Sequence, residues 1–176
     1  MIYLKTDEEV ELMRLSNDLL GRTLAEVAKV IRPGVTTAEL DKVAYEFICD
    51  NGGIPSCLGY EGYPATLCTS VNEQVVHGIP SDKVILKDGD IVSVDTVVKL
   101  NGFCADSAYT FPVGEVAPEV LQLMRTTKEA LYLGIEQAVT GRRLGDIGAV
   151  IQNHCERAGY SVVREFVGHG IGRDMH

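Results

Sequence analysis

The chain has 176 residues, of which 45% are hydrophobic and 23% charged, and its formal net charge is −9. These values are typical of a folded globular domain with a substantial core. The acidic balance argues against a nucleic-acid-binding surface. No apolar run is long enough to span a membrane, and the acidic amino terminus does not resemble a signal peptide. Five cysteines without a C-x-x-C pair favour reduced thiols and a cytoplasmic location.

Two capping boxes predict two helices in the first part of the chain. The segment Thr6–Glu9 opens an amphipathic helix that is expected to run to about Ile31. The segment Thr36–Glu39 opens a second helix over residues 37–50. Residues 54–66, which are rich in Gly, Pro and Tyr, are expected to form a loop. The remaining predicted elements are short strands at 67–70 and 75–77, helices at 118–139 and 146–157, and a strand at 161–163.

The most informative segment is a predicted β-hairpin over residues 91–111. Asn101-Gly102 lies between two runs of β-branched and aromatic residues, which is the strongest short-range signal for a hairpin turn. A two-residue loop pairs Leu100 with Phe103 and places Asp106 opposite Val97. The other face is predicted to supply the core, from Val92, Val94, Val98, Leu100, Phe103, Tyr109 and Phe111.

This register places two aspartates side by side. Because side chains alternate along a strand, Asp95 and Asp106 share one face as diagonal neighbours, with Cα atoms about 7–8 Å apart. Adjacent carboxylates repel each other unless something lies between them, and their oxygens suit one or two divalent cations. The alternative is a solvated acidic face without a ligand.

Two histidines are candidate partners for this acidic pair. His169 is flanked by glycines, which let a backbone approach a ligand closely, and neutral imidazole is the commonest metal ligand. An ordinary surface histidine is the alternative. His77 precedes Gly78 at the end of an apolar run, where a histidine hydrogen-bonded to backbone is the alternative. His154 lies mid-helix and is assigned a structural or exposed role.

Small sulfur-containing and aromatic residues border the loop that precedes the hairpin. Such side chains suit an apolar pocket for a linear, polarizable group, although an ordinary core would use the same residues. The candidates for the pocket are Cys57, Tyr60, Tyr63 and Cys68.

A weak internal repeat relates the two parts of the chain. The order helix, glycine, helix, glycine, strand occurs twice, and it aligns Leu40 with Ile147 and Gly52 with Gly159. The pattern predicts two structural halves of αα-β character. A second hairpin at the same offset would lie beyond His176, so either the repeat is fortuitous or the second half is incomplete.

Several ordered motifs resemble those of type I methionine aminopeptidases, and the similarity covers nearly the whole chain. The matching segments are Cys68–Glu73, Val76–Pro80, Gly89–Asp95, Asn101–Asp106 and Gly168–Gly172. The resemblance implies an α/β (α+β) pita-bread fold with pseudo-two-fold αα-β halves. It predicts a single catalytic domain over residues 1–176 that is truncated at the C-terminus, with its second half incomplete.

The resemblance also implies roles for individual residues. It assigns Asp95, Asp106 and His169 as ligands of divalent metal ions, normally two per site and drawn from Co, Mn, Fe or Zn. It assigns His77 and His176 to contact with the substrate. The methionine pocket would be lined by Cys57, Tyr60, Tyr63 and Cys68, with Met175 at a position that is often phenylalanine.

The implied function is removal of N-terminal methionine from nascent proteins by metal-activated water in the cytoplasm. The family's last two ligands are glutamates beyond the position of His176, so reduced or single metal occupancy and little activity are expected from this chain alone. A catalytically inactive module that binds peptides or a partner is the alternative, and a prolidase-like enzyme is a third hypothesis. An incomplete sheet would also expose an edge, which predicts self-association.

Overall fold

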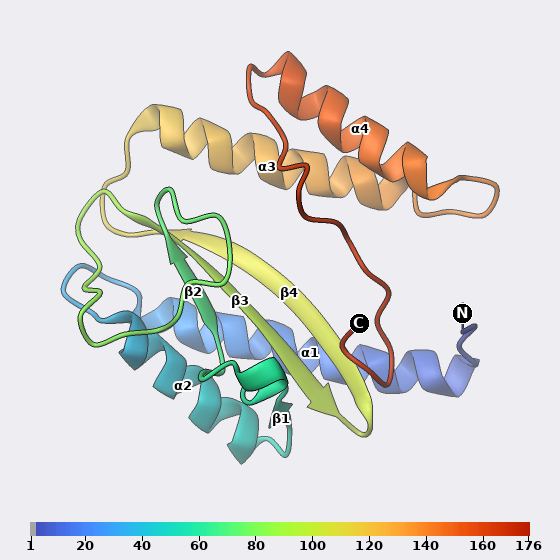
Figure 1. Ribbon diagram of the computed structural model, residues 1–176, viewed down its shortest axis with the longest axis horizontal. Coiled ribbons are helices and arrows are strands. Elements are labelled where there is room, and N and C mark those ends of the chain that lie inside the picture. The colour runs from blue at the N-terminus through green and yellow to red at the C-terminus, as the bar shows by residue number, and fades with distance from the viewer. Residues whose placement is uncertain (1–2) are drawn as a thin grey trace. The chain divides into compact units, whose positions relative to one another are not determined.

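A computed structural model describes residues 3–176, and these fall into two compact units (Figure 1). One unit comprises the described residues up to Glu115 together with His169–His176, and the other comprises Val116–Gly168. The first unit contains α1 (Asp7–Val30), α2 (Thr37–Asp50), β1 (Ile54–Pro55), a 3₁₀ turn η1 (Tyr60–Gly62), β2 (Cys68–Val71), β3 (Ile91–Leu100) and β4 (Phe103–Pro112). The second contains α3 (Pro118–Glu136) and α4 (Leu144–Arg157). Within the described part of the chain, no helix is long and apolar enough to cross a membrane.

Both predicted capping boxes are confirmed at the starts of α1 and α2. The Thr6 hydroxyl accepts a hydrogen bond from the Glu9 amide (3.3 Å), and the Glu9 carboxylate accepts one from the Thr6 amide (3.1 Å). Thr36 and Glu39 form the same reciprocal pair. These bonds satisfy amides that an α-helix leaves without a partner in its first turn.

The second unit is a pair of packed helices. Proline at the first position of α3 costs no hydrogen bond there, which explains why the helix begins at Pro118. The backbone of α3 approaches α4 closely at Gly134, where a Cβ would lie 2.9 Å from the Ile151 side chain. Helix α4 begins two residues earlier than predicted, because the Asp146 carboxylate accepts a hydrogen bond from the Arg143 amide (2.8 Å).

The first unit is built on a four-stranded antiparallel sheet with β3 at its centre. Strand β4 pairs with one side of β3, while β1 and β2 pair with the other side. Leu100 lies opposite Phe103 and Val97 lies opposite Asp106, so the predicted hairpin register is confirmed. On its other side Asp95 faces Cys68 of β2, which places this carboxylate in the middle of the sheet.

Helices α1 and α2 cover one face of this sheet and leave the aspartate face clear of helices within the unit (Figure 1). The core between helices and sheet is closed by fully buried side chains, which include Leu19, Leu20, Val27, Leu40, Ile48, Val92, Val94 and Val98. Tyr109 was predicted to belong to this core but is 45% exposed. It lies on the outer strand β4 and packs against the Phe111 ring, with centroids 4.8 Å apart.

Two of the predicted strands are wrong, and one strand was missed. Residues 75–77 form no strand, because the Thr69 amide of β2 instead donates to the Gly78 carbonyl (2.7 Å) and the chain arches between them. Residues 161–163 are also irregular, and no strand of the described chain pairs with them. The missed strand β1 has two residues and exists only through its pairing with β3. Such a short element has no periodicity to detect.

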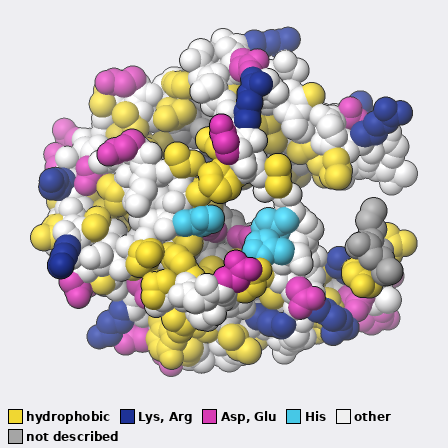
Figure 2. Space-filling view, in the orientation of Figure 1, with side chains coloured by type: hydrophobic (Ala, Val, Ile, Leu, Met, Phe, Trp, Pro, Cys, Tyr) yellow, Lys and Arg dark blue, Asp and Glu magenta, His cyan; other side chains and the backbone are white. Residues whose placement is uncertain are grey.

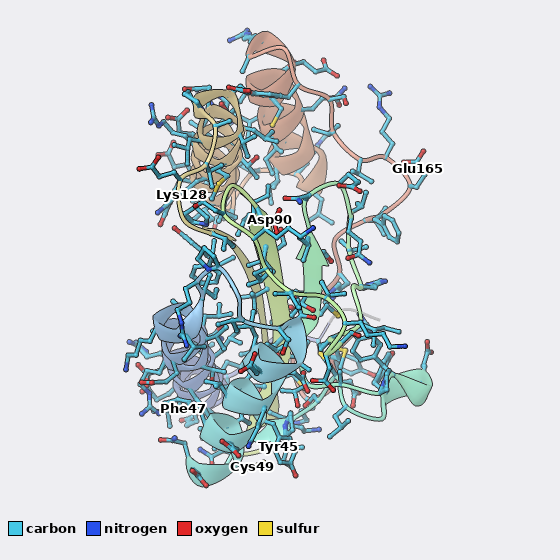
Figure 3. The ribbon with its side chains drawn as sticks, turned by 90° about the vertical axis from the view of Figure 1, so that its left-hand side faces the viewer. Tyr45, Phe47, Cys49, Asp90, Lys128 and Glu165 are labelled. Carbon is cyan, nitrogen blue, oxygen red and sulfur yellow. The ribbon has the colours of Figure 1, made fainter. Side chains whose placement is uncertain are left out.

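Polar side chains hold the turn that leads into β3. The Asp90 carboxylate accepts hydrogen bonds from the Asn72 side-chain amide and from the Lys87 backbone amide, both at 2.8 Å (Figure 3). The Asn72 carbonyl in turn accepts from the Ile91 amide (3.0 Å). The entry to the hairpin is therefore fixed by side-chain hydrogen bonds in addition to the strand pairing.

On α2, Tyr45 and Cys49 are exposed and take no part in the core (Figure 3).

The outer edge of β4 is covered at its beginning. The Cys104 amide donates to the Gly172 carbonyl (2.7 Å), so the last residues of the chain lie along this part of the strand. Farther along, residues 107–109 are exposed. Self-association through a sheet edge stays a prediction that sedimentation would test.

Candidate metal centre

The acidic pair lies where the hairpin register predicts it, on the face opposite the helices. The pKa of Asp95 is raised to about 6, first because burial disfavours its charge and then because the Asp106 carboxylate lies beside it. Hydrogen bonding between the two carboxyl groups adds to this rise in the pKa of Asp95. Two ionised carboxylates have no hydrogen to share, so this bond requires a proton on one of them. A cation could take the place of that proton.

His169 turns one ring nitrogen toward the same acids. Its Nε2 lies 3.2 Å from Oδ2 of Asp106, and its Nδ1 lies 3.0 Å from the Gly170 carbonyl oxygen. A carbonyl only accepts, so Nδ1 carries a hydrogen, and in the neutral ring the lone pair is then on Nε2. That lone pair and a carboxylate oxygen face each other, an arrangement that suits a shared proton or a shared cation. Metal-binding histidines typically donate their other N–H to such a carbonyl.

The three predicted ligands form a series of pairwise contacts and do not surround one point. Asp95 contacts Asp106, and Asp106 contacts His169. Across residues 3–176, no three His, Cys, Asp or Glu side chains form a group already spaced to hold a metal ion. The chemistry of the donors and the orientation of His169 fit a divalent cation. Their role as ligands remains a prediction.

His77 lies near the acids on an unusual backbone. Its charge lowers the pKa of Asp95, which places the imidazole within electrostatic reach of that carboxylate. His77 has a φ of 60°, a left-handed conformation that is rare for non-glycine residues. The next residue, Gly78, is held against β2 through its amide, which donates to the Ser70 hydroxyl (3.1 Å). The β2 edge therefore sets the position of His77.

His176 is brought to the same region by the last residues of the chain. Its Nδ1 lies 2.9 Å from the Tyr60 hydroxyl, and its ring meets the His169 ring edge-on, with centroids 4.4 Å apart. Histidine side chains gather beside acidic ones on the face shown in Figure 2. Tyr60 is 41% exposed and its hydroxyl contacts this histidine, and its role in the pocket stays a prediction.

The other three pocket candidates lie at strands β2 and β3 or at the residue before β2. Cys57 Sγ accepts from the Val97 amide at 3.3 Å, Cys68 is paired with Asp95 across the sheet, and the Tyr63 hydroxyl donates to the Leu67 carbonyl at 3.0 Å. Burial raises the pKa of Cys57 to about 12 and also raises the pKa values of Cys68 and Tyr63. Thiols with raised pKa values stay protonated and weakly nucleophilic. They are therefore suited to form apolar walls rather than to attack a substrate.

Sequence reasoning missed the contacts that fasten the last residues to the sheet. The Arg173 guanidinium pairs with the Glu9 carboxylate (2.9 Å) and lies 4.5 Å from the centre of the Phe103 ring. The Lys99 ammonium donates to the Arg173 carbonyl (2.7 Å). These bonds place His169 and His176 beside the hairpin. The two members of the ion pair are 164 residues apart, so no local pattern could have revealed it.

Asp41 on α2 was also missed. Its Oδ1 accepts hydrogen bonds from the Thr66 amide (2.9 Å) and the Leu67 amide (2.7 Å), just before β2. Burial raises the pKa of this carboxyl. From sequence, an acid in the first turns of a helix is an ordinary favourable feature, which hides any further role.

Divalent cations are expected to stabilise the protein more at pH 7.5 than at pH 5. The folded-state pKa of Asp95, about 6, lies above its ordinary value of 3.8. The protonated carboxyl therefore favours the fold at low pH, and this benefit is lost as the pH rises through about 6. Above that pH a cation relieves the repulsion, whereas below it the cation must displace a proton. Melting temperatures with and without Mn²⁺ should show an increment several degrees larger at pH 7.5. Equal increments at both pH values would contradict this reading.

The comparisons with known proteins agree with the geometry. The profile of metallopeptidase family M24 matches residues 11–176. The methionine aminopeptidase of Clostridium acetobutylicum is 50% identical over 176 residues, which are 100% of this chain and 70% of that protein. The chain thus spans about 70% of the length of this curated relative.

Solved structures share the fold. The methionine aminopeptidase from Rickettsia prowazekii superposes with a TM-score of 0.98 at 42% identity, covering 100% of this chain and 71% of that chain. An Xaa-Pro dipeptidase from Bacillus anthracis has a TM-score of 0.80 at 22% identity, covering 98% of this chain and 47% of that chain. At that identity the second likeness shows the fold alone, which is the pita-bread fold predicted from the sequence.

Proposed function

This chain belongs to metallopeptidase family M24, and on that premise we propose that it removes the N-terminal methionine from nascent proteins. The observation that carries the proposal is the chain of contacts from Asp95 through Asp106 to His169 on the open face of the hairpin. A family of metallopeptidases requires divalent metal ions, and these three side chains are the donors that such ions use.

The proposed metal ligands are Asp95, Asp106 and His169. The proposed ions are drawn from Co, Mn, Fe or Zn, normally two per site, with reduced or single occupancy in this chain. When bound, such ions polarise a carbonyl and lower the pKa of water. The chain's own contribution is orientation. The Gly170 carbonyl holds the N–H of His169, and Asp106 lies between the other two donors, so it links all three proposed ligands.

His176 is proposed to contact the peptide as a hydrogen-bond donor. A phenol is a better donor than a neutral imidazole N–H, so the Tyr60 hydroxyl donates to Nδ1 of His176. The remaining ring nitrogen, Nε2, then carries the hydrogen and can donate to a carbonyl oxygen of the substrate. His77, near Asp95, is proposed to contact the same part of the peptide from the β2 side.

The methionine side chain is proposed to lie against Cys57, Tyr60, Tyr63 and Cys68. Protonated thiols and an aromatic ring offer polarizable, weakly polar surfaces that suit a thioether. All five cysteines of the chain are free, which supports a reducing compartment and a cytoplasmic location. The partner in this proposal is the amino terminus of a nascent peptide.

The test is hydrolysis of a Met-Gly-type peptide by the purified chain with added Co²⁺ or Mn²⁺. A chelator and the Asp106→Asn variant control for contaminating host enzyme. Low turnover that both controls abolish is expected, since little activity is expected from this chain alone. Metal binding without any turnover would favour the inactive peptide-binding module. Cleavage limited to peptides with proline in the second position would favour a prolidase-like enzyme.

A further inference from the structure

Asp41 is a half-buried carboxylate that the proposed chemistry does not use. It projects from α2 toward the residues that precede β2, and one oxygen, Oδ1, accepts from two successive amides, those of Thr66 and Leu67. Both of these residues are buried. Buried amides are almost always hydrogen-bonded, so the loss of this oxygen would leave two donors without water to replace it.

The two carbonyls of the same dipeptide are also held by side chains. The Thr66 carbonyl accepts from the Thr96 hydroxyl (2.8 Å), and the Leu67 carbonyl accepts from the Tyr63 hydroxyl (3.0 Å). All four backbone polar groups of residues 66 and 67 are thus bound by side chains from α2, from β3 and from the segment after η1. A dipeptide bonded in this way is a junction between three elements, and it takes its conformation from them.

This junction adjoins two walls of the proposed methionine pocket, Tyr63 and Cys68. Cys68 follows it directly and is paired with Asp95. Tyr63 is bonded to it, and the Tyr63 hydroxyl also lies 3.3 Å from the Gly78 carbonyl, beside His77. A shift at residues 66 and 67 would therefore move Cys68, Tyr63 and the His77 loop together.

We propose that Asp41 is a positioning residue that sets the width of the methionine pocket through the Thr66–Leu67 backbone. The inference rests on the proposed function, because the pocket is part of it. Asp41 touches neither the substrate nor the metal ligands, and it acts through two amides. It determines which side chain fits the pocket rather than the rate of bond cleavage.

The need for an acceptor oxygen at this position follows from its geometry. A carboxylate oxygen can accept several hydrogen bonds, so one atom can hold both amides. Burial raises the pKa of the group, while the two amides oppose that rise. Asparagine keeps one acceptor oxygen of the same reach, alanine removes it, and glutamate displaces it by one methylene.

The test compares Asp41→Asn, Asp41→Glu and Asp41→Ala with Asp50→Ala, an exposed change on the same helix. For metal-loaded protein, Asp41→Ala is expected to raise KM for a Met-Gly-type peptide about tenfold and to weaken discrimination against a Leu-Gly peptide about tenfold. The kcat should stay within about twofold. Asp41→Asn and Asp50→Ala should resemble the parent chain, and Asp41→Glu should lie between the two groups.

Two readouts separate this inference from the proposed function. Amide hydrogen exchange at residues 66–68 and NMR titration with L-methionine need no turnover. If the parent chain does not cleave Met-Gly peptides, Asp41 is still judged by faster exchange and weaker L-methionine binding in Asp41→Ala. If that variant does not fold, Asp41→Glu against Asp41→Asn decides. The proposal would be overturned if folded Asp41→Ala, or Asp41→Glu where Asp41→Ala does not fold, showed the same amide exchange and the same L-methionine affinity as the parent chain.

Discussion

Replacing Asp95 with asparagine is expected to stabilise the metal-free protein while abolishing its response to divalent cations. The rise in the pKa of Asp95 from 3.8 to about 6 measures how strongly the fold disfavours its charge. That difference corresponds to at most about 3 kcal/mol at neutral pH, and partial exposure of the side chain reduces it to about 1–2 kcal/mol. Asparagine removes the repulsion and can donate a hydrogen bond to Asp106.

The same substitution should cost activity. A cation contributes several kcal/mol to catalysis in metallohydrolases, and a loss of about 4 kcal/mol lowers kcat/KM about a thousandfold. Urea unfolding at pH 7.5, with chelator and then with Mn²⁺, measures the change in stability and the response to the cation. Steady-state hydrolysis of a Met-Gly-type peptide measures the change in kcat/KM. Ser93→Ala is the matched control, because Ser93 lies on the same face of β3 and bonds to Thr110 instead of to the acids. A variant that is less stable than the parent in chelator would refute the account.

Replacing Gly78 with alanine is expected to lower kcat/KM about a hundredfold, because a displacement of about 1 Å in a substrate-contacting group has effects of that size. A Cβ at this position would overlap the Thr69 carbonyl oxygen and would lie 2.8 Å from the Gln74 side-chain oxygen. The Thr69 carbonyl belongs to β2 and cannot give way. The segment that carries His77 must therefore move outward, at a cost of about 1–3 kcal/mol in stability.

This prediction is checked by steady-state kinetics together with the free energy of unfolding. Gly145→Ala serves as the control, since a Cβ at Gly145 on α4 meets nothing within 4 Å. The His77→Ala variant sets the scale: Gly78→Ala should approach its loss of activity while retaining the imidazole. Parent-level activity in Gly78→Ala would show that the placement of His77 does not depend on the β2 edge.

Features held by short-range interactions could be predicted from the sequence. The hairpin register follows from Asn101-Gly102 and from the alternation of side chains, and it places Asp95 and Asp106 on one face without any knowledge of the rest of the fold. The capping boxes at Thr6 and Thr36 likewise close within one helical turn. In each case the interacting groups are near neighbours along the chain or across one ladder.

Predictions failed where structure depends on a distant partner. Residues 75–77 and 161–163 have strand-like composition, yet a strand forms only when a neighbour offers a ladder of hydrogen bonds. The two residues of β1 pair with β3. Residues 75–77 pair with no strand among the described residues, because Gly78 occupies the edge of β2. Composition shows which residues tolerate a strand, while packing decides which of them pair.

The candidate site shows the same division. Residue type and spacing identified the acidic pair and the glycine-flanked His169 by themselves, because these signals lie within short segments. Only the tertiary structure places His169 against Asp106 and brings Arg173 to Glu9, and only it reveals Asp41 as the acceptor for the amides before β2. These contacts join elements that are far apart in the chain. Their free energy depends on burial and on the packing of the whole unit, which no local pattern records.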